Sequence, residues 1–135
     1  MRIFLGANIL FSAAKTDGAV RRLLQLLLGR GHECHVDEYV VTEARRNLAI
    51  KGPAALTYLD SLLAQLRTSP IQAANATPVD LLWLPEKDRP VLAAAIVLRC
   101  DALVTGDQTH FGKAYGKTFG GLTVYSPRQL AEVLF

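Results

Sequence analysis

The sequence contains little cysteine and no long apolar run. Its two cysteines, Cys34 and Cys100, stand far apart and form no CxxC pair. This argues against a disulfide framework, so we expect two buried free thiols in a reducing compartment. No stretch of about 18 apolar residues occurs, and we predict no membrane span. The N-terminus carries one arginine and then a strand-like segment, unlike a signal peptide. We therefore expect a cytoplasmic protein.

Several common sequence patterns are also missing. No internal repeat, low-complexity tract or linker interrupts the 135 residues, which predicts a single domain spanning residues 1–135. No GxGxxG follows the first apolar segment, so a dinucleotide-binding fold is disfavoured. The same place lacks the paired acids that a receiver-like signalling domain needs, and we rank that class last.

The chain is mildly basic and rich in apolar residues. Its formal net charge is +3, its pI is about 9.1, and 50% of its residues are hydrophobic. Such a composition supports a full hydrophobic core without disulfides. It also suits a polyanionic partner without proving one. The placement of the charges is therefore more informative than their sum.

Short apolar segments alternate with amphipathic ones along the chain. We predict strands at residues 2–5, 33–36, 70–73, 102–107 and 122–126. We predict helices after Asn8, from Val20 to about Gly29, and at residues 37–52, 54–66, 86–100 and 127–135. The alternation predicts an α/β fold in which helices cover both faces of a parallel sheet.

Three acids stand out by their positions. Glu43 lies near the start of a predicted helix, Asp88 opens another, and Asp107 follows the strand "ALV". Each has an ordinary alternative: a solvated helix acid, a helix cap and a turn residue, respectively. Ligands of parallel sheets bind beyond the carboxyl ends of the strands, where these three positions can meet. Together they suggest a Mg²⁺ site.

Four blocks of sequence contain these acids in a fixed order. They are "FLGANIL" at the first strand, "TEARRNL" with Glu43, "DRPVLAAAI" with Asp88, and "LVTGDQTHF" with Thr105, Asp107 and His110. In order and spacing the chain resembles PIN-domain proteins, of the kind found as VapC-type toxins in bacterial toxin–antitoxin pairs. The resemblance covers nearly the whole chain, and the last block is its most specific part.

The resemblance implies a fold, a chemistry and partners. The implied fold is a three-layer α/β/α sandwich with a central, mainly parallel sheet of four or five strands. The implied activity is metal-dependent hydrolysis of RNA, in which Glu43, Asp88 and Asp107 hold Mg²⁺ or Mn²⁺. Asn8 and Thr105 would orient the carboxylates or a bound water. The expected partners are an RNA substrate, a cognate antitoxin and a second copy in a homodimer.

Position 6 departs from the family pattern. The family has an aspartate where this chain has Gly6, and glycine supplies no ligand. Inside a strand it would also cost roughly 0.5–1 kcal/mol relative to alanine. We therefore expect reduced or abolished activity. The alternative is a catalytically inactive PIN-fold module that binds RNA or an antitoxin. Either a natural degenerate site or a deliberate substitution would explain the glycine.

Basic and aromatic residues flank the acidic blocks. The bases are Arg45, Arg46, Arg89, Arg99, Lys113 and Lys117. Among them, Lys113, Lys117 and Arg46 are our candidates for RNA binding; the alternative is that they are surface bases that contact only solvent. Trp83 and Tyr125 are candidates for stacking on RNA bases; the alternative is packing in the core or an interface.

Three further features have two interpretations each. His110 is placed to contact phosphate or a metal-bound water, or else packs on Phe111. The predicted helix at 54–66 is a candidate dimer or antitoxin surface, or else core. The segment "GHECH" invites a zinc site, but its His32, Cys34 and His35 are an incomplete tetrahedral set.

Overall fold

The computed structural model describes residues 1–71 and 80–135. Within this part of the chain, six strands form one sheet in the order β3-β2-β1-β4-β6-β5. Their bounds are β1 Arg2–Leu5, β2 Glu33–Asp37, β3 Arg67–Ser69, β4 Ala102–Val104, β5 Thr118–Phe119 and β6 Leu122–Tyr125. All neighbours pair in parallel except β5, which runs antiparallel to β6.

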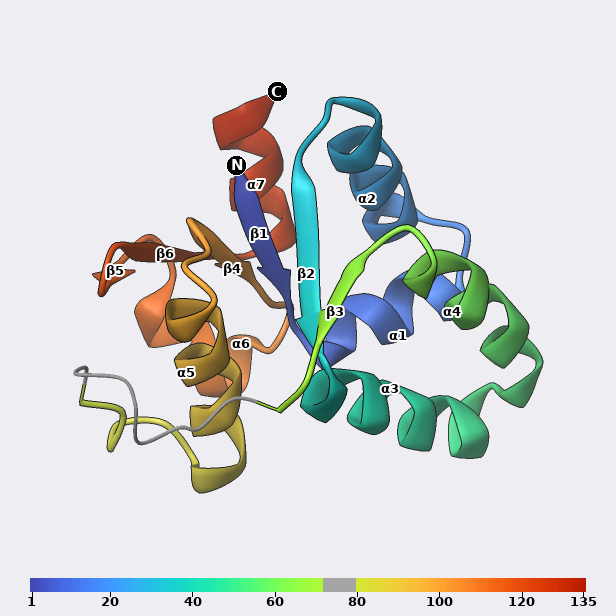
Figure 1. Ribbon diagram of the computed structural model, residues 1–135, viewed down its shortest axis with the longest axis horizontal. Helices are drawn as coiled ribbons and strands as arrows, with labels where there is room; N and C mark the ends of the chain where they lie inside the picture. Colours follow the sequence, from blue (N-terminus) through green and yellow to red (C-terminus); the bar gives the residue numbers. More distant parts are fainter. Residues whose placement is uncertain (72–79) are drawn as a thin grey trace.

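Helices flank this sheet. In Figure 1, α1 to α4 lie to one side of the central strands, and α5 and α6 lie to the other. The α-helices are α1 Ala7–Lys15, α2 Ala19–Gly29, α3 Glu38–Lys51, α4 Leu56–Leu63, α5 Arg89–Val97, α6 Gln108–Phe111 and α7 Pro127–Leu134. Short 3₁₀ turns are η1 Pro53–Ala55, η3 Glu86–Asp88 and η4 Gly112–Ala114. The predicted α/β fold with a mainly parallel sheet is confirmed.

The strand order places a crevice between β1 and β4. From β1 the chain builds β2 and β3 on one side, then returns to add β4 and β6 on the other. Where the connections after two neighbouring parallel strands lead to opposite sides of the sheet, an opening is left beyond the carboxyl ends of the strands. Ligands of open α/β sheets bind in this opening. In this chain that opening lies between Gly6 and Thr105. None of the helices in the described ranges is both long and apolar enough to cross a membrane.

Apart from Arg2 at the start of β1, the two central strands are buried completely. Ile3, Phe4 and Leu5 of β1 have no exposed surface, and neither do the three residues of β4. Both strands read as continuous apolar runs because helices cover both faces of a parallel sheet. The residues just after these strands are therefore held on a rigid support.

The prediction of a strand at residues 70–73 was wrong. The third strand is Arg67–Ser69, paired with β2 so that Ser69 faces Asp37. Proline has no N–H to donate to a strand ladder, which explains why the strand ends before Pro70. Residues 72 and 73 lie outside the described part of the chain.

The described sheet has six strands rather than the predicted four or five. The extra strand, β5, forms a hairpin with β6 through Gly120 and Gly121. Both glycines have positive φ, 57° and 85°, as a two-residue hairpin turn of this kind requires. A two-residue strand carries no alternating pattern, so the paired glycines are its only sequence signal.

Helix boundaries also differ from the predictions. The helix expected at 54–66 is α4, Leu56–Leu63, preceded by the 3₁₀ turn at Pro53. The helix expected at 86–100 begins as a 3₁₀ turn and becomes α5 only at Arg89. It ends at Val97, and Arg99 beyond it adopts a left-handed φ of 57°. These differences leave Asp88 and Asp107 at the ends of elements, while Glu43 lies within α3.

Candidate metal site at the carboxyl edge of the sheet

A cleft of about 250 Å³ opens beyond the carboxyl ends of β1 and β4. It brings together six residues that the sequence singled out, namely Gly6, Asn8, Glu43, Asp88, Thr105 and Asp107. These residues come from four separate segments of the chain. The predicted convergence of the three acids is therefore present in the structure.

Gly6 occupies the N-cap of α1 rather than a strand interior. Its φ and ψ are −69° and 160°, its N–H donates to the Val104 carbonyl, and its own carbonyl accepts from Ile9 and Leu10. Any residue adopts this conformation, and glycine is tolerated at an N-cap. The strand-interior cost assigned to Gly6 from the sequence was therefore wrong.

The space around Gly6 accommodates a side chain. A Cβ atom there would lie 3.4 Å from the Val104 carbonyl oxygen and 3.5 Å from both Cβ and Oγ1 of Thr105. These are ordinary van der Waals distances. A carboxylate at this position would enter the cleft beside Thr105. The glycine thus leaves a gap in the acidic lining, and the backbone conformation at this position does not require glycine.

Asn8 ties the start of α1 to the turn that follows β4. Its side-chain amide donates to Thr105 Oγ1 at 3.2 Å, and its Oδ1 accepts from the Gly106 N–H at 3.0 Å. Thr105 Oγ1 also accepts from the Asp107 N–H at 3.1 Å. The turn that carries Asp107 is held by these bonds. This is a positioning role of the kind expected for Asn8 and Thr105 from the sequence.

Asp88, Asp107 and His110 meet at one point. The Nδ1 atom of His110 lies 2.8 Å from Oδ2 of Asp88 and 2.9 Å from Oδ2 of Asp107. The three side chains are 13%, 28% and 27% exposed, respectively. His110 therefore contacts both acids directly. The sequence placed it near the site but did not predict this pairing.

The ordinary alternatives for the two aspartates were a turn residue for Asp107 and a helix cap for Asp88, and the structure shows a cap at Asp107 instead. Asp107 caps α6, because its Oδ1 accepts from the His110 N–H at 3.1 Å. Asp88 precedes α5 but its side chain makes no capping hydrogen bond. The cap interpretation of Asp88 is therefore wrong. Its carboxylate points instead toward His110.

The carboxylates act on each other and on their neighbours. Burial and the nearby Asp107 raise the pKa of Asp88, while His110 opposes the rise. Burial raises the pKa of Tyr39, and the charges of Glu43 and Asp88 add to the rise. Clustered negative charge in a partly buried cleft favours the binding of a cation.

The donor set fits a divalent cation. Asp88, Asp107 and His110 each offer one ligand atom, and these atoms lie within 4.8 Å of one another. Among the described residues, Asp88 Oδ2 and His110 Nδ1 are buried and find no hydrogen bond of suitable geometry, although they contact each other. With Glu43 in the same cleft, three carboxylates are available, the ligand type that suits Mg²⁺ and Mn²⁺.

Residues 2–109 match the family model described as PIN domain. This chain belongs to the PIN domain family. Of the solved structures, VapBC2 from Rickettsia felis bound to a promoter DNA fragment has a TM-score of 0.68 at 17% identity, over 93% of this chain and 98% of that one. FitAB bound to an IR36 DNA fragment has a TM-score of 0.60 at 16% identity, over 93% of this chain and 94% of that one. These likenesses concern the fold. No curated protein matches.

Two residues of the PIN domain's cleft were missed from the sequence. Asn47 and Lys51 line it together with Glu43. The three are spaced by four residues along α3, which places them on one helix face. The spacing itself was the available signal. Lys51 gives the acidic cleft a cationic rim.

The predicted RNA-binding bases fall into two groups. Arg46 lies with Glu43, Tyr39 and Lys87 in an adjoining cleft. Lys113 and Lys117 do not line the acidic cleft but a separate one, described below.

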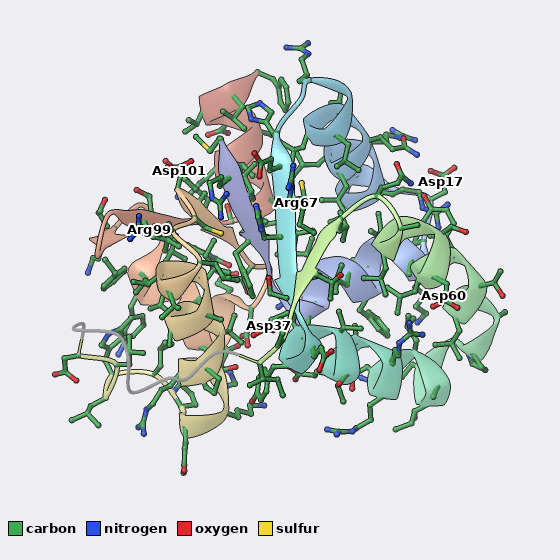
Figure 2. All side chains as sticks on the ribbon, in the orientation of Figure 1. Asp17, Asp37, Asp60, Arg67, Arg99 and Asp101 are labelled. Carbon is green, nitrogen blue, oxygen red and sulfur yellow. The ribbon has the colours of Figure 1, made fainter. Side chains whose placement is uncertain are left out.

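The other flanking arginines have structural contacts. Arg45 pairs with Asp60 at 2.7 Å, and Arg89 Nε donates to the carbonyls of Leu81 and Leu84. Arg99 follows α5 near the start of β4. In Figure 2 it lies beside β4 and well away from Asp37, which marks the carboxyl end of β2. These three residues are therefore poor candidates for contact with a substrate at the acidic cleft.

Several remaining sequence alternatives resolve as packing. In α4, Leu59 and Leu62 are buried in the core. Tyr125 packs against the core from β6. Cys34 and His35 are buried in β2, where His35 Nε2 lies 3.2 Å from Glu33 Oε1. Whether α4 also serves a partner stays a prediction.

Proposed function

We propose that this PIN domain is a metal-dependent endoribonuclease and the toxin of a toxin–antitoxin pair, with activity that Gly6 reduces or abolishes. The observation that carries the proposal is the convergence of Glu43, Asp88 and Asp107 in one cleft beyond β1 and β4. The family assignment adds independent support.

Each residue of the cleft has a distinct task in this proposal. Glu43, Asp88 and Asp107 would hold Mg²⁺ or Mn²⁺. The bound ion supplies Lewis-acid charge and a water of lowered pKa for phosphodiester hydrolysis. Asn8 and Thr105 fix the turn that aims Asp107.

The cationic rim has a role in binding. Lys51 lies in the same cleft as the three acids, where its ammonium group would attract the RNA phosphate that the acids alone would repel. Arg46, in the adjoining cleft with Glu43, would extend this attraction along the RNA backbone. Both contacts would be independent of sequence, because they are made to phosphate rather than to bases.

The gap at Gly6 affects the metal more than the fold. A fourth carboxylate is lacking from a site that has room for it. His110 meanwhile places a nitrogen between two of the remaining carboxylates. The missing acid would weaken metal binding relative to a site with an aspartate at position 6, and an ion would also have to compete with His110 for Asp88 and Asp107.

The same two features favour a second candidate function. If the gap and His110 keep metal out, the chain is a binding module with a PIN fold that holds RNA or an antitoxin without cleavage. Metal titration separates the two candidates. Saturable Mn²⁺ binding that Asp88→Asn abolishes supports a residual enzyme site.

An antitoxin partner is proposed from the neighbours and the family resemblance. The two solved complexes are VapBC2 and FitAB, each bound to DNA. We propose that this chain pairs with an antitoxin, forms a homodimer and acts in the cytoplasm. Co-purification with the product of the adjacent reading frame, and the mass of the isolated chain in solution, test these points.

The decisive experiment restores the acid. Gly6→Asp should cleave single-stranded RNA in the presence of Mg²⁺ or Mn²⁺, and chelation should stop cleavage. Gly6→Ala is the matched control, because it adds the Cβ without the carboxylate. Gly6→Asp combined with Asp88→Asn should be inactive. A folded Gly6→Asp protein without metal-dependent cleavage contradicts the proposal, and equal cleavage by the unaltered chain contradicts the role of Gly6.

A further inference from the structure

An aromatic pair lies on the surface outside the acidic cleft. The rings of Trp83 and Phe119 stack with centroids 5.3 Å apart and planes 23° from parallel. The two residues belong to distant segments of the chain. Trp83 is 40% exposed. A large ring that is stacked on one side and open to solvent presents a flat apolar surface, which is unusual for a side chain that serves only the core.

The exposed indole is not needed to anchor its own segment. Leu81 and Leu84, on either side of it, are buried, and Arg89 Nε donates to both of their carbonyls. The segment is therefore held by these neighbours. Trp83 projects from it toward Phe119.

Two lysines border the aromatic pair. Trp83 and Phe119 line a cleft of about 260 Å³ together with Lys113, Ala114 and Lys117. Both lysines are exposed. Among the residues that the structure describes, no acidic side chain lines this cleft. Flat aromatic surface combined with positive charge is the arrangement by which proteins hold single-stranded nucleic acid, stacking its bases and neutralising its phosphates.

Two segments connect this aromatic–lysine cleft to the acidic cleft. One runs from Trp83 to Asp88, and the other from Asp107 to Lys113, so that each contributes a residue to both clefts. The six residues from Gln108 to Lys113 form α6 and the first two residues of η4, a helical rise of roughly 10 Å. The two clefts are therefore close enough for one short oligonucleotide to occupy both.

We propose that the aromatic–lysine cleft is a subsite for single-stranded RNA, in which a base stacks on Trp83 and the flanking phosphates contact Lys113 and Lys117. The choice of RNA as ligand rests on the proposed function. The lysines favour a polyanion over a neutral apolar peptide. Bound here, an RNA strand would be held in place next to the acidic cleft.

The single tryptophan of the chain provides a direct probe. Titration with a single-stranded RNA of about 12 nucleotides, in chelator so that no cleavage occurs, should quench Trp83 fluorescence to saturation. An abasic strand of equal length should bind more weakly and quench little. Quenching by the abasic strand equal to that by RNA would overturn stacking.

Variants test the two components separately by anisotropy of labelled RNA. Trp83→Ala should weaken binding roughly 5- to 100-fold. Leu82→Ala removes an exposed apolar side chain that does not line the cleft, and it should leave affinity unchanged. Joint Lys113→Gln and Lys117→Gln substitutions should lower the slope of log affinity against log salt by about 1.4. Phe119→Leu gives a second test of stacking if Trp83→Ala fails to fold.

Two results would overturn the subsite. One is saturating RNA binding by anisotropy with unchanged Trp83 fluorescence. The other is an acidic peptide that quenches Trp83 and cannot be displaced by RNA, which would assign the cleft to a protein partner. Failure of the proposed function is distinguishable, because it appears as absent cleavage by Gly6→Asp while RNA still quenches Trp83.

Discussion

The side-chain amide of Asn8 donates a 3.2 Å hydrogen bond to Oγ1 of Thr105, across 97 positions of sequence. The same amide accepts from the backbone of Gly106. One side chain at the start of α1 thus holds the turn that follows β4. Since Asp107 belongs to that turn, the geometry of the acidic cleft depends on a residue that contributes no charge to it.

Replacement of Asn8 should therefore disturb both stability and metal binding. Asn8→Ala removes two hydrogen bonds, and we expect a loss of about 1–2 kcal/mol in unfolding free energy because water replaces part of them. Weaker Mn²⁺ binding should accompany the loss. Urea unfolding and calorimetry measure the two effects. Asn8→Asp keeps the acceptor for Gly106 but not the donor, so its unfolding free energy should lie between those of the parent and Asn8→Ala. An Asn8→Ala protein identical to the parent in stability and in Mn²⁺ binding would refute the assignment.

Gly6→Asp should show opposite stability effects with and without metal. Its Cβ fits without strain, and Asp is at least as good an N-cap as Gly. The added charge, however, faces other carboxylates, and at about 4 Å each such pair costs on the order of 4 kcal/mol at an effective dielectric near 20, before screening by ions. Without metal the variant should therefore be no more stable than this chain.

Millimolar Mg²⁺ should raise the melting temperature of Gly6→Asp more than that of Gly6→Ala. The reason is that ligand binding to the folded state stabilises it in proportion to affinity. Thermal unfolding with and without the ion gives the comparison. Equal shifts in the two proteins would mean that position 6 does not face the ion.

Sequence reasoning succeeded where short-range signals and topology coincide. Apolar runs at β1 and β4 marked buried parallel strands, and the rule that ligands lie beyond their carboxyl ends placed Gly6 and Asp107 together. It failed where strands lack a pattern, as in the polar Arg67–Ser69 and the two-residue β5. No periodicity exists in so few residues.

Contacts made only in the tertiary structure were also out of reach. Nothing local indicates that His110 reaches both Asp88 and Asp107, or that Trp83 stacks on Phe119. Lys51 is a different case. Its spacing of eight residues from Glu43 on one helix could have been used, and was overlooked because it is not an acid.

His110 should stabilise the metal-free protein. Its Nδ1 atom lies 2.8 Å from the Asp88 carboxylate and 2.9 Å from the Asp107 carboxylate. His110→Ala would leave the two carboxylates facing each other. Because the three side chains are partly exposed, we expect a loss of about 1 kcal/mol or less at low ionic strength. The loss should shrink with salt or with added Mn²⁺. His32→Ala, far from the cleft, is the control; an equal loss in both variants would contradict the role given to His110.

The two cysteines should be inert in the folded protein and should affect its stability at alkaline pH. Burial raises the pKa of Cys34 from 9.0 to about 12 and that of Cys100 to about 11. Ellman's reagent should therefore label them only after unfolding near neutral pH, because the thiolate is the reactive form. Rapid labelling of the native chain would contradict their burial.

The sign of the pH effect follows from the raised pKa. The folded state keeps the Cys34 proton at pH values where the unfolded state has lost it, so the contribution is full below pH 9. It falls by roughly 1.4 kcal/mol for each pH unit above that, until the folded thiol also ionises. In urea unfolding, the free energy of unfolding of Cys34→Ala should decline less steeply with rising pH than that of the parent. Equal declines in the two proteins would refute the effect.

Lys51 should contribute to RNA affinity through charge alone. It lines the acidic cleft from α3, where a phosphate must come close to three carboxylates, and Lys51→Gln removes the cation nearest to that position on its helix face. We expect weaker binding to all single-stranded sequences alike, and a salt slope lower by about 0.7. Arg30→Gln removes the same charge at the far end of the sheet, where Arg30 stacks over Phe135. If the two variants weaken RNA binding equally, net charge and not the position of Lys51 governs affinity.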